Sequence, residues 1–310
     1  MSKRILLAVS EVSNFQGERS GSLSSWRIDS GIGQLSRLSE ISSGGPGPCH
    51  ITLDSTACVA LVANYGDGSV AAFPIERDGR LGETTGVLRQ MGMSINESRQ
   101  AGPHAHGTFV SPSNRYAVVT DLGADRLYLY RLDARNARLE SCSPASLPVD
   151  AGTGPRHFAF HPTGKFGYLI GELNSTIIGY RCNTNRADLD KIGVESATAR
   201  GFSGANDAAE IAIDRSGGFL YCSNRGADDL AVFAIGRGGE LIAKQRIACG
   251  GRTPRHFALD PTERFLLVAN QDSDEVAVFS RDGDTGILAD TSRRMQISQP
   301  ACLAFAPCSE

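Results

Sequence analysis

The chain has 310 residues, 41% of them hydrophobic, which is enough to bury a substantial core in one large domain or two modest ones. Its 31 basic and 34 acidic residues leave a formal charge of −3. This balance excludes the basic excess expected of a sequence-independent nucleic-acid binder, so no nucleic-acid partner is expected.

The N-terminal segment contains only five apolar residues, Ile5 to Val9, before Ser10 and Glu11. That run is far shorter than a signal-peptide core or the roughly 20 residues of a membrane span. We therefore expect a cytoplasmic protein without a membrane partner. The sequence identifies no protein partner.

Eight cysteines are scattered along the chain, with neither a Cys-x-x-Cys pair nor the spacing of a zinc site. They stand at positions 49, 58, 142, 182, 222, 249, 302 and 308. We expect them to be reduced and mostly buried, because disulfide frameworks belong to smaller secreted domains. Neither a metal nor another cofactor is predicted.

In chain order, the first predicted elements are strands at residues 5–11 and 22–28, rich in apolar and β-branched residues. A longer pattern then starts at Pro48 and recurs about every fifty residues, with further copies beginning at residues 103, 155, 208 and 254. Each copy predicts an apolar strand, a turn, a second apolar strand, a third such as residues 69–75, and a polar fourth strand. The last predicted element, residues 301–307, is a first strand with nothing after it.

Four-stranded modules of this length, punctuated by 35 glycines and 13 prolines, predict an all-β fold of the β-propeller type. The two ends complement each other, because the N-terminus supplies second and third strands and the C-terminus supplies a first strand. We therefore expect one propeller domain over residues 1–310. Six blades are counted, five of them continuous and one closed by pairing of the N- and C-terminal strands.

The repeat also predicts where a site lies. Its copies align at His50, Gly107, His157, Glu210, His256 and Cys302. The residues just before this position are Cys49, His106, Arg156, Ala209, Arg255 and Ala301, and those at the end of the second strands are Glu11, Tyr65, Leu122, Glu172, Arg225 and Gln271. In an antiparallel hairpin these two positions are neighbours, so they meet at one mouth of the propeller channel.

Four residues at these positions depart from the small or apolar residues of other blades: His106, Arg156, Glu172 and Arg225. Together they are able to bind an anion and move a proton, which makes them the candidate catalytic group. Structural alternatives stay open. In one alternative, Arg156 or Arg225 donates hydrogen bonds to neighbouring backbone carbonyls. In another, Glu172 only neutralises the charge of Arg156 across the hairpin. The recurrence of His50, His157 and His256 favours a framework role, and His104 either lines the mouth or caps a loop.

At these same residues the chain resembles the β-propeller lactonases, a family that includes 6-phosphogluconolactonases of the propeller type and 3-carboxy-cis,cis-muconate lactonizing enzymes. The most specific resembling segments are Pro103-His-Ala-His106, Gly154-Pro-Arg-His157 and Gly171-Glu-Leu-Asn-Ser175. The resemblance implies seven blades, one more than the repeat supplies. It also implies catalytic roles for His106, Arg156, Glu172 and Arg225. Around them we expect His104, His157, Arg255, Asn174 and Tyr65 to contact the substrate.

The implied activity is hydrolysis of a small anionic sugar-acid lactone, most directly 6-phosphogluconolactone. We expect Glu172 or His106 to act as general base or acid, while Arg156 and Arg225 hold the phosphate or carboxylate and polarise the carbonyl. Two alternatives stay open at this point. One is a cycloisomerase that runs related chemistry, and the other is a non-catalytic propeller that binds a ligand on one face.

Overall fold

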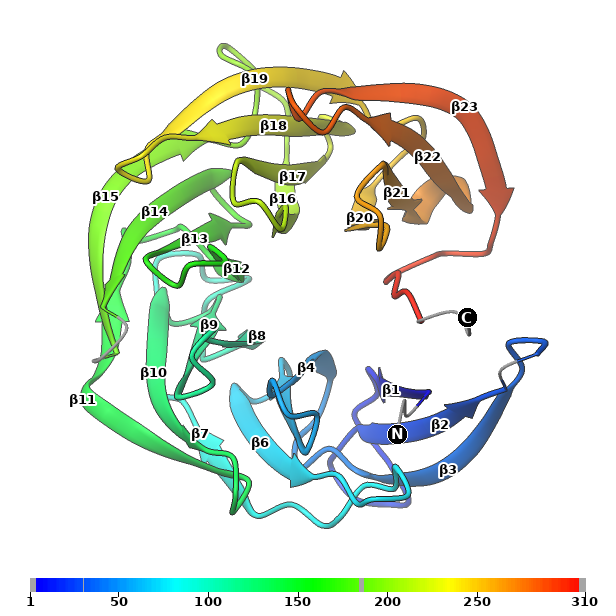
Figure 1. Ribbon diagram of the computed structural model, residues 1–310. Coiled ribbons are helices and arrows are strands. Elements are labelled where there is room, and N and C mark those ends of the chain that lie inside the picture. The colour runs from blue at the N-terminus through cyan, green and yellow to red at the C-terminus, as the bar shows by residue number, and fades with distance from the viewer. Residues whose placement is uncertain (1–3, 30, 184–186, 307–310) are drawn as a thin grey trace. The chain divides into compact units, whose positions relative to one another are not determined.

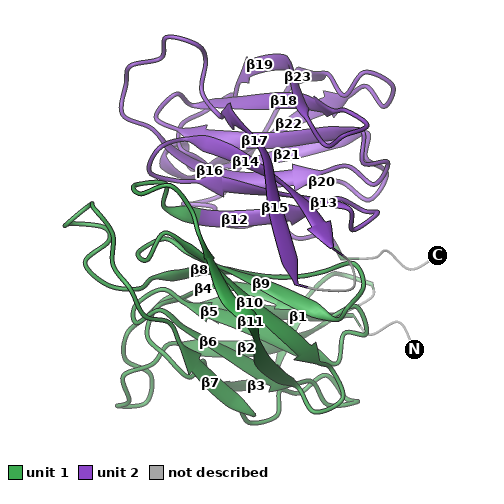
Figure 2. Ribbon diagram, turned by 90° about the vertical axis from the view of Figure 1, so that its left-hand side faces the viewer, with its two compact units in different colours: residues 1–155, 306–310 green, residues 156–305 purple. Residues whose placement is uncertain are grey.

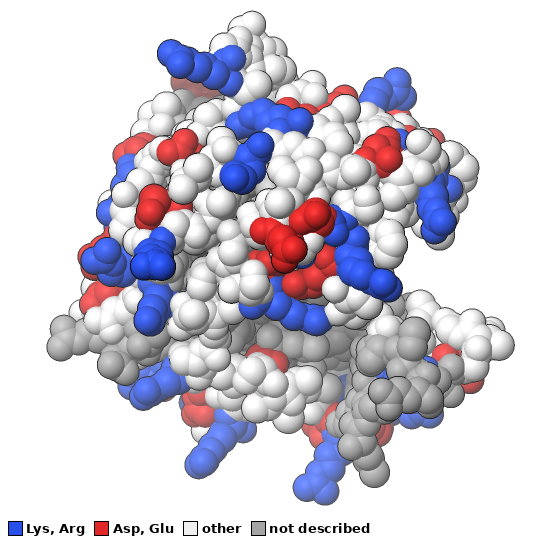
Figure 3. Space-filling view, turned by 45° about the horizontal axis from the view of Figure 1, so that its top comes forward, with Lys and Arg blue, Asp and Glu red and all other residues white. Residues whose placement is uncertain are grey.

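The computed structural model describes residues 4–29, 31–183 and 187–306, and the regular structure there is almost entirely β (Figure 1). Its strands form six antiparallel sheets, and the single 3-10 turn of these ranges is η1, Gln271–Ser273. Within them there is also no helix of the length and apolarity that a membrane span requires. On the face drawn in Figure 3, basic and acidic side chains are intermixed, as the small net charge suggests.

The described residues group into two compact units, residues 1–155 with 306–310 and residues 156–305 (Figure 2). The expected single domain stays a prediction. Unit 1 contains three sheets. Their strands are β1 (Ile5–Ser10), β2 (Ser22–Ile28) and β3 (Leu35–Ser42); β4 (Pro48–Leu53), β5 (Val59–Asn64), β6 (Ser69–Pro74) and β7 (Gly86–Arg89); and β8 (Ala105–Val110), β9 (Tyr116–Asp121), β10 (Arg126–Asp133) and β11 (Arg138–Pro148).

Unit 2 contains three four-stranded sheets whose strands follow one another in chain order, the arrangement of propeller blades. These strands are β12 (Pro155–Phe160), β13 (Phe166–Gly171), β14 (Thr176–Asn183) and β15 (Asp188–Ser196); β16 (Asp207–Ile213), β17 (Phe219–Arg225), β18 (Asp229–Ile235) and β19 (Leu241–Ala248); and β20 (Pro254–Leu259), β21 (Phe265–Asn270), β22 (Glu275–Arg281) and β23 (Leu288–Gln296).

Strand β5 shows how the sequence specifies the packing of neighbouring sheets. All its residues are buried. Val62 packs with Leu23 of the preceding sheet, whereas Leu61 packs with Ala117 of the following one. Because successive side chains of a strand point to opposite faces, a strand covered on both faces must be apolar throughout. The second strands therefore appear in the sequence as continuous apolar runs.

Several first strands contain a β-bulge just before the aligned position of the repeat. In β8 the register passes from Ala105 to Gly107, so His106 is not paired within the ladder. The register of β4 likewise omits Cys49, that of β20 omits Arg255, and that of β16 omits Ala209 and Glu210. A bulge turns its extra residue away from the regular pleat, which explains why this position carries special side chains.

One expectation about the termini is wrong. Residues 301–306 form no strand, contrary to the predicted C-terminal strand, and the first sheet has three strands, β1 to β3. The closure of a blade by the two termini stays a prediction. The C-terminal segment makes other bonds instead. Gln299 donates its backbone N–H to Asp274 Oδ1 at 2.8 Å, and Leu303 donates its own to His256 Nδ1 at 3.2 Å. Position 307 of the predicted strand lies outside the described residues.

Candidate active site

A carboxylate and two guanidinium groups lie together in unit 2. Arg156 is the second residue of β12, Glu172 directly follows β13, and Arg225 is the last residue of β17. Arg156 Nε donates to Glu172 Oε2 at 3.0 Å, and Arg225 Nη2 lies 2.9 Å from the same oxygen. These side chains are 4%, 4% and 14% exposed for Arg156, Glu172 and Arg225, respectively. The hairpin geometry thus brings together the three unit 2 members of the candidate group.

The two arginines differ in how fully their donors are used. Arg156 Nη1 donates to the Ala209 carbonyl at 2.6 Å, which fixes the guanidinium between two sheets. Arg225 Nε donates to the Asp207 carbonyl at 3.2 Å, but its Nη2 is buried without a well-directed hydrogen bond, despite its short contact with Glu172. Arg225 is therefore held less firmly by Glu172 than Arg156 is.

The electrostatics of Arg156 reflect its burial and its neighbours. Burial, followed by repulsion from Arg225, lowers the pKa of Arg156 to about 10, against the attraction of Glu172 and Glu210. Arg156 still carries its charge at neutral pH because this pKa remains well above 7. Arg255 adds a smaller repulsive contribution. This part of unit 2 is consequently a buried cationic cluster suited to an anionic substrate.

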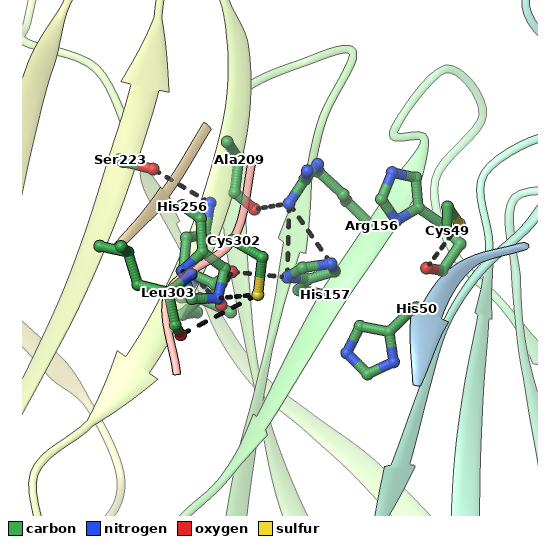
Figure 4. Close-up of polar contacts among 12 residues, drawn as sticks. Cys49, His50, Arg156, His157, Ala209, Ser223, His256, Cys302 and Leu303 are labelled. Carbon is green, nitrogen blue, oxygen red and sulfur yellow. Dashed lines mark hydrogen bonds and ion pairs between the residues drawn. The ribbon is translucent and has the colours of Figure 1, made fainter. Parts of the chain in front are cut away.

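Next to Arg156, a buried carboxylate contacts two imidazole rings. Glu210 Oε2 lies 3.1 Å from His157 Nδ1 and 3.4 Å from His256 Nε2. Figure 4 shows His157 beside Arg156 and Ala209, with His256 beside Cys302 and Leu303. The described residues contain no cluster of three or more His, Cys, Asp or Glu side chains arranged to hold a metal ion. The Glu210 carboxylate connects the two rings. The framework role expected of His157 and His256, and the contact of His157 with substrate, stay predictions.

Protonation states in this group follow from burial and charge. Burial alone would raise the pKa of Glu210, but His157 and His256 outweigh it and hold that pKa well below the usual range. Burial lowers the pKa of His157, whereas Glu210 and Cys302 raise the pKa of His256 against the effect of burial. Glu210 is therefore ionised at neutral pH, and His157 is neutral.

Two further predicted substrate contacts in unit 2 have different surroundings. Arg255 is half-buried at the bulge of β20, at the repeat position that Arg156 occupies in β12. Asn174 is exposed, and its Oδ1 accepts hydrogen bonds from the backbone N–H and the hydroxyl of Thr176 at 3.2 and 2.7 Å. These bonds give Asn174 a turn-forming role. Its contact with substrate stays a prediction.

In unit 1, the remaining predicted residues form an aromatic cluster. The rings of Tyr65 and His104 stack with centroids 4.4 Å apart, and His106 meets Tyr65 edge-on at 5.8 Å. His104 Nδ1 lies 2.7 Å from the Tyr65 carbonyl, and its backbone N–H donates to Asp121 Oδ1 at 2.8 Å. The His106 side chain is buried on β8. Its role in proton transfer stays a prediction.

Glu210 is the site residue that the sequence reasoning did not select. It stands at the aligned position of the repeat, where three other copies carry histidine. Departure from the repeat pointed to His106 and Arg156 one position earlier, and the same test applied to the aligned position finds Glu210. Its contacts with His157 and His256 come from neighbouring sheets, which no local sequence pattern records.

Comparison with known proteins agrees with the fold and with the resemblance. A family model described as "Lactonase, 7-bladed beta-propeller" matches residues 1–305. The 6-phosphogluconolactonase of Bacillus subtilis (strain 168) is 34% identical over 286 residues, which are 92% of this chain and 80% of that protein. The 6-phosphogluconolactonase of Formosa agariphila is 32% identical over 289 residues, or 91% of this chain and 80% of the relative.

A solved structure extends the similarity to three dimensions. The periplasmic gluconolactonase of Pseudomonas aeruginosa matches with a TM-score of 0.91 and 32% sequence identity, covering 99% of this chain and 86% of that one. The described residues form six sheets, whereas the family description specifies seven blades.

Proposed function

Because the chain belongs to the family of seven-bladed β-propeller lactonases, we propose that it hydrolyses a sugar-acid lactone, with 6-phosphogluconolactone as substrate and 6-phosphogluconate as product. The relatives named above are 6-phosphogluconolactonases and a gluconolactonase, which supports this substrate class. None of those names is an isomerase's, so the cycloisomerase alternative has no support among them.

The observation that carries the proposal is the buried Glu172 carboxylate between Arg156 and Arg225, with Arg225 Nη2 left without a well-directed hydrogen bond. Ester hydrolysis requires a base for water and positive charge for the carbonyl oxygen as it becomes negative. The Glu172 carboxylate supplies the first requirement, and the fixed guanidinium of Arg156 supplies the second. Arg225 and Arg255 supply further charge for the substrate phosphate.

In the proposed reaction, Glu172 accepts a proton from water while the water oxygen bonds to the lactone carbonyl carbon. Arg156 stabilises the resulting oxyanion. The bond between that carbon and the ring oxygen then breaks, and the ring oxygen leaves as a hydroxyl after receiving the proton. A substrate phosphate that attracts Arg225 would weaken its ion pair with Glu172 and leave the carboxylate more basic.

The proposal is tested by hydrolysis of 6-phosphogluconolactone by the purified chain, by Glu172→Gln and by Arg156→Ala. Glu172→Gln is expected to lower kcat by about 10² to 10⁴-fold, because it removes the base. Arg156→Ala is expected to lower kcat/KM by about 10² to 10³-fold, because it removes the oxyanion partner. Glu195→Gln, which changes an exposed glutamate of β15 in the same unit, is the matched control and should retain wild-type activity.

Full activity in both site variants would disprove the assigned residues. A well-folded wild-type protein that hydrolyses no lactone would disprove the activity itself and would favour the ligand-binding module. His106 is the second predicted proton-transfer group, and it belongs to unit 1. It is therefore tested apart from the unit 2 residues, by His106→Asn.

We also propose a cytoplasmic location. The cysteines of the described ranges, Cys49, Cys58, Cys142, Cys182, Cys222, Cys249 and Cys302, are all free, which fits a reducing compartment. The structural neighbour from Pseudomonas aeruginosa carries a periplasmic name, so the compartment requires its own test. Cell fractionation followed by thiol labelling should find the protein with reduced thiols in the cytoplasmic fraction, and recovery in an exported fraction would disprove this location.

A further inference from the structure

Two of the three aligned histidines of the repeat, His50 and His256, accept a hydrogen bond from a later segment of the chain. His50 Nδ1 accepts the backbone N–H of Thr108 at 3.3 Å, on the first strand of the next sheet. His256 Nδ1 accepts the backbone N–H of Leu303 at 3.2 Å in the same way. In both cases the partner directly follows the next aligned position, so each of these two histidines holds the chain that follows.

Glu210 occupies the aligned position but makes different bonds. Its Oε1 accepts the backbone N–H of Ile211 at 3.1 Å, and its Oε2 contacts His157 and His256. The backbone N–H of Glu210 is held by the Ser223 hydroxyl at 3.1 Å. Glu210 is thus a buried carboxylate whose two oxygens are both bonded. Among the aligned positions of the sequence it is the one that carries a carboxylate, where three others carry histidine.

The bonds of Glu210 lead directly to Arg156. Ala209, whose carbonyl accepts Arg156 Nη1, precedes Glu210 in the bulge of β16, so fixing Glu210 also fixes that carbonyl. Arg156 Nη1 lies 3.3 and 3.4 Å from the two ring nitrogens of His157, and it therefore contacts the ring as a whole. His157 is held in turn by Glu210 Oε2 at 3.1 Å. Two of the groups that surround the guanidinium are therefore anchored on Glu210.

We propose that Glu210 is a positioning residue of the active site, which holds Arg156 through Ala209 and His157 and offsets the positive charge around Glu172. This inference rests on the proposed lactonase function. Glu210 is not a catalytic residue in this scheme, because it touches other side chains and the backbone rather than the reacting atoms.

Five positively charged or titratable side chains of unit 2 lie around Glu172 and Glu210. They are Arg156 and His157 from β12, Arg225 from β17, and Arg255 and His256 from β20. With His157 neutral, three arginines and His256, whose pKa is raised, face two carboxylates. Removing the charge of Glu210 leaves Glu172 as the only anion of this group, so Glu172 becomes a weaker base.

The experiment compares kcat, KM and the pH profile of kcat/KM for wild type, Glu210→Gln and Glu210→His, with 6-phosphogluconolactone as substrate. Glu210→His introduces the residue that the repeat carries at three other aligned positions, so it suits the fold but lacks the negative charge. Both variants are expected to lose about 10-fold or more in kcat. The acid limb of their profiles is expected to move to lower pH by about one unit. Glu210→Asp, which keeps the charge, should recover the position of this limb.

Tyr221→Phe is the matched control for a loss of stability alone. Tyr221 is buried in the same sheet, and its hydroxyl bonds the Gly286 carbonyl instead of the site. It should reduce stability without moving the acid limb. If Glu210→Gln does not fold, Glu210→His decides the matter.

Folded Glu210 variants with a wild-type kcat and an unmoved acid limb would overturn the positioning role. The same is true if their activity falls only in proportion to the folded fraction. Failure of the proposed function has a different result, because wild type itself would then not hydrolyse the lactone, or Glu172→Gln would remain fully active.

Discussion

Arg255 differs from Arg156 in its bonds, although both occupy the same position of the repeat. Arg156 is held by Glu172 and by the Ala209 carbonyl. Arg255 is half-buried, repels Arg156, and makes no hydrogen bond or ion pair within the described part of unit 2. A guanidinium with unused donors beside a buried cationic cluster is suited to a phosphate group of the substrate.

Arg255→Ala is therefore expected to raise KM for 6-phosphogluconolactone by about 10-fold or more, the value of one charge-assisted hydrogen bond. It should leave KM for the unphosphorylated gluconolactone within about 2-fold, because that substrate lacks the phosphate. Steady-state kinetics with the two lactones checks this prediction, and equal increases for both would contradict it.

Asp121 is a second residue whose charge conflicts with its surroundings. Three other second strands carry asparagine at the equivalent position, Asn64, Asn224 and Asn270, and each donates its side-chain amide to a backbone carbonyl. Asp121 Oδ1 accepts the backbone N–H groups of His104 and Ala124, but Oδ2 is buried without a hydrogen bond in the described structure. Burial raises the pKa of Asp121, so the folded state penalises its charged form.

We expect Asp121→Asn to stabilise the protein by about 1 kcal/mol or more at pH 8, because the amide keeps the acceptor and removes the unbonded anionic oxygen. The gain should decrease as the pH falls through the raised pKa of Asp121 in the folded protein, since the wild-type carboxyl then becomes neutral. Denaturant unfolding at pH 8 and pH 4 measures both free energies. A variant that is less stable than wild type at pH 8, or a gain that grows toward acid pH, would contradict the argument.

At the scale of the strands, hydrogen bonds from tyrosine hydroxyls to glycine carbonyls connect neighbouring sheets of unit 2. Tyr168 donates its hydroxyl to the Gly239 carbonyl at 2.8 Å, and Tyr221 donates to the Gly286 carbonyl at 3.0 Å. Gly286 has a positive φ of 74°, and a Cβ there would lie 2.3 Å from the Phe219 ring. The turn between β22 and β23 thus needs glycine both for its backbone conformation and for close contact with β17.

Gly286→Ala is expected to lower the free energy of unfolding by about 2 kcal/mol or more, from left-handed strain together with overpacking against Phe219. Gly193→Ala is the matched control, because Gly193 has no atom within 4 Å of an added Cβ and no positive φ. It should change stability by no more than about 0.5 kcal/mol. Chemical denaturation of the two variants measures both free energies of unfolding, and equal values would contradict the need for glycine at position 286.

The same elements show how far sequence predicts this fold. The second strands were predicted correctly because a strand that is covered on both faces, such as β5, leaves a continuous apolar run in the sequence. The hairpin geometry placed Arg156 and Glu172 together, and the structure shows their contact. The bulges at His106 and Arg255 have no comparable pattern, because a bulge depends on the register between two strands. The C-terminal strand was predicted wrongly, since an apolar segment does not show whether its backbone meets a strand or a side chain such as His256.

For the molecule as a whole, the single domain stays a prediction, and the described residues group into two compact units. The division falls between Pro155 and Arg156, which is inside β12 and not in a linker. Domain boundaries usually fall in exposed linkers with few contacts. A blade also cannot bury both of its faces alone, so repeats of this kind depend on their neighbours for stability. We therefore expect the chain to unfold as one cooperative unit.

The single tryptophan, Trp26, makes this expectation testable because it reports on unit 1 alone. It lies on β2, where its ring N–H donates to the Ser24 hydroxyl at 2.9 Å. Gly286→Ala destabilises unit 2. If the chain is cooperative, this variant lowers the thermal midpoint of Trp26 fluorescence as much as that of far-ultraviolet circular dichroism, by about 4 °C or more. If the units unfold independently, the Trp26 midpoint stays at its wild-type value while the circular dichroism curve separates into two steps.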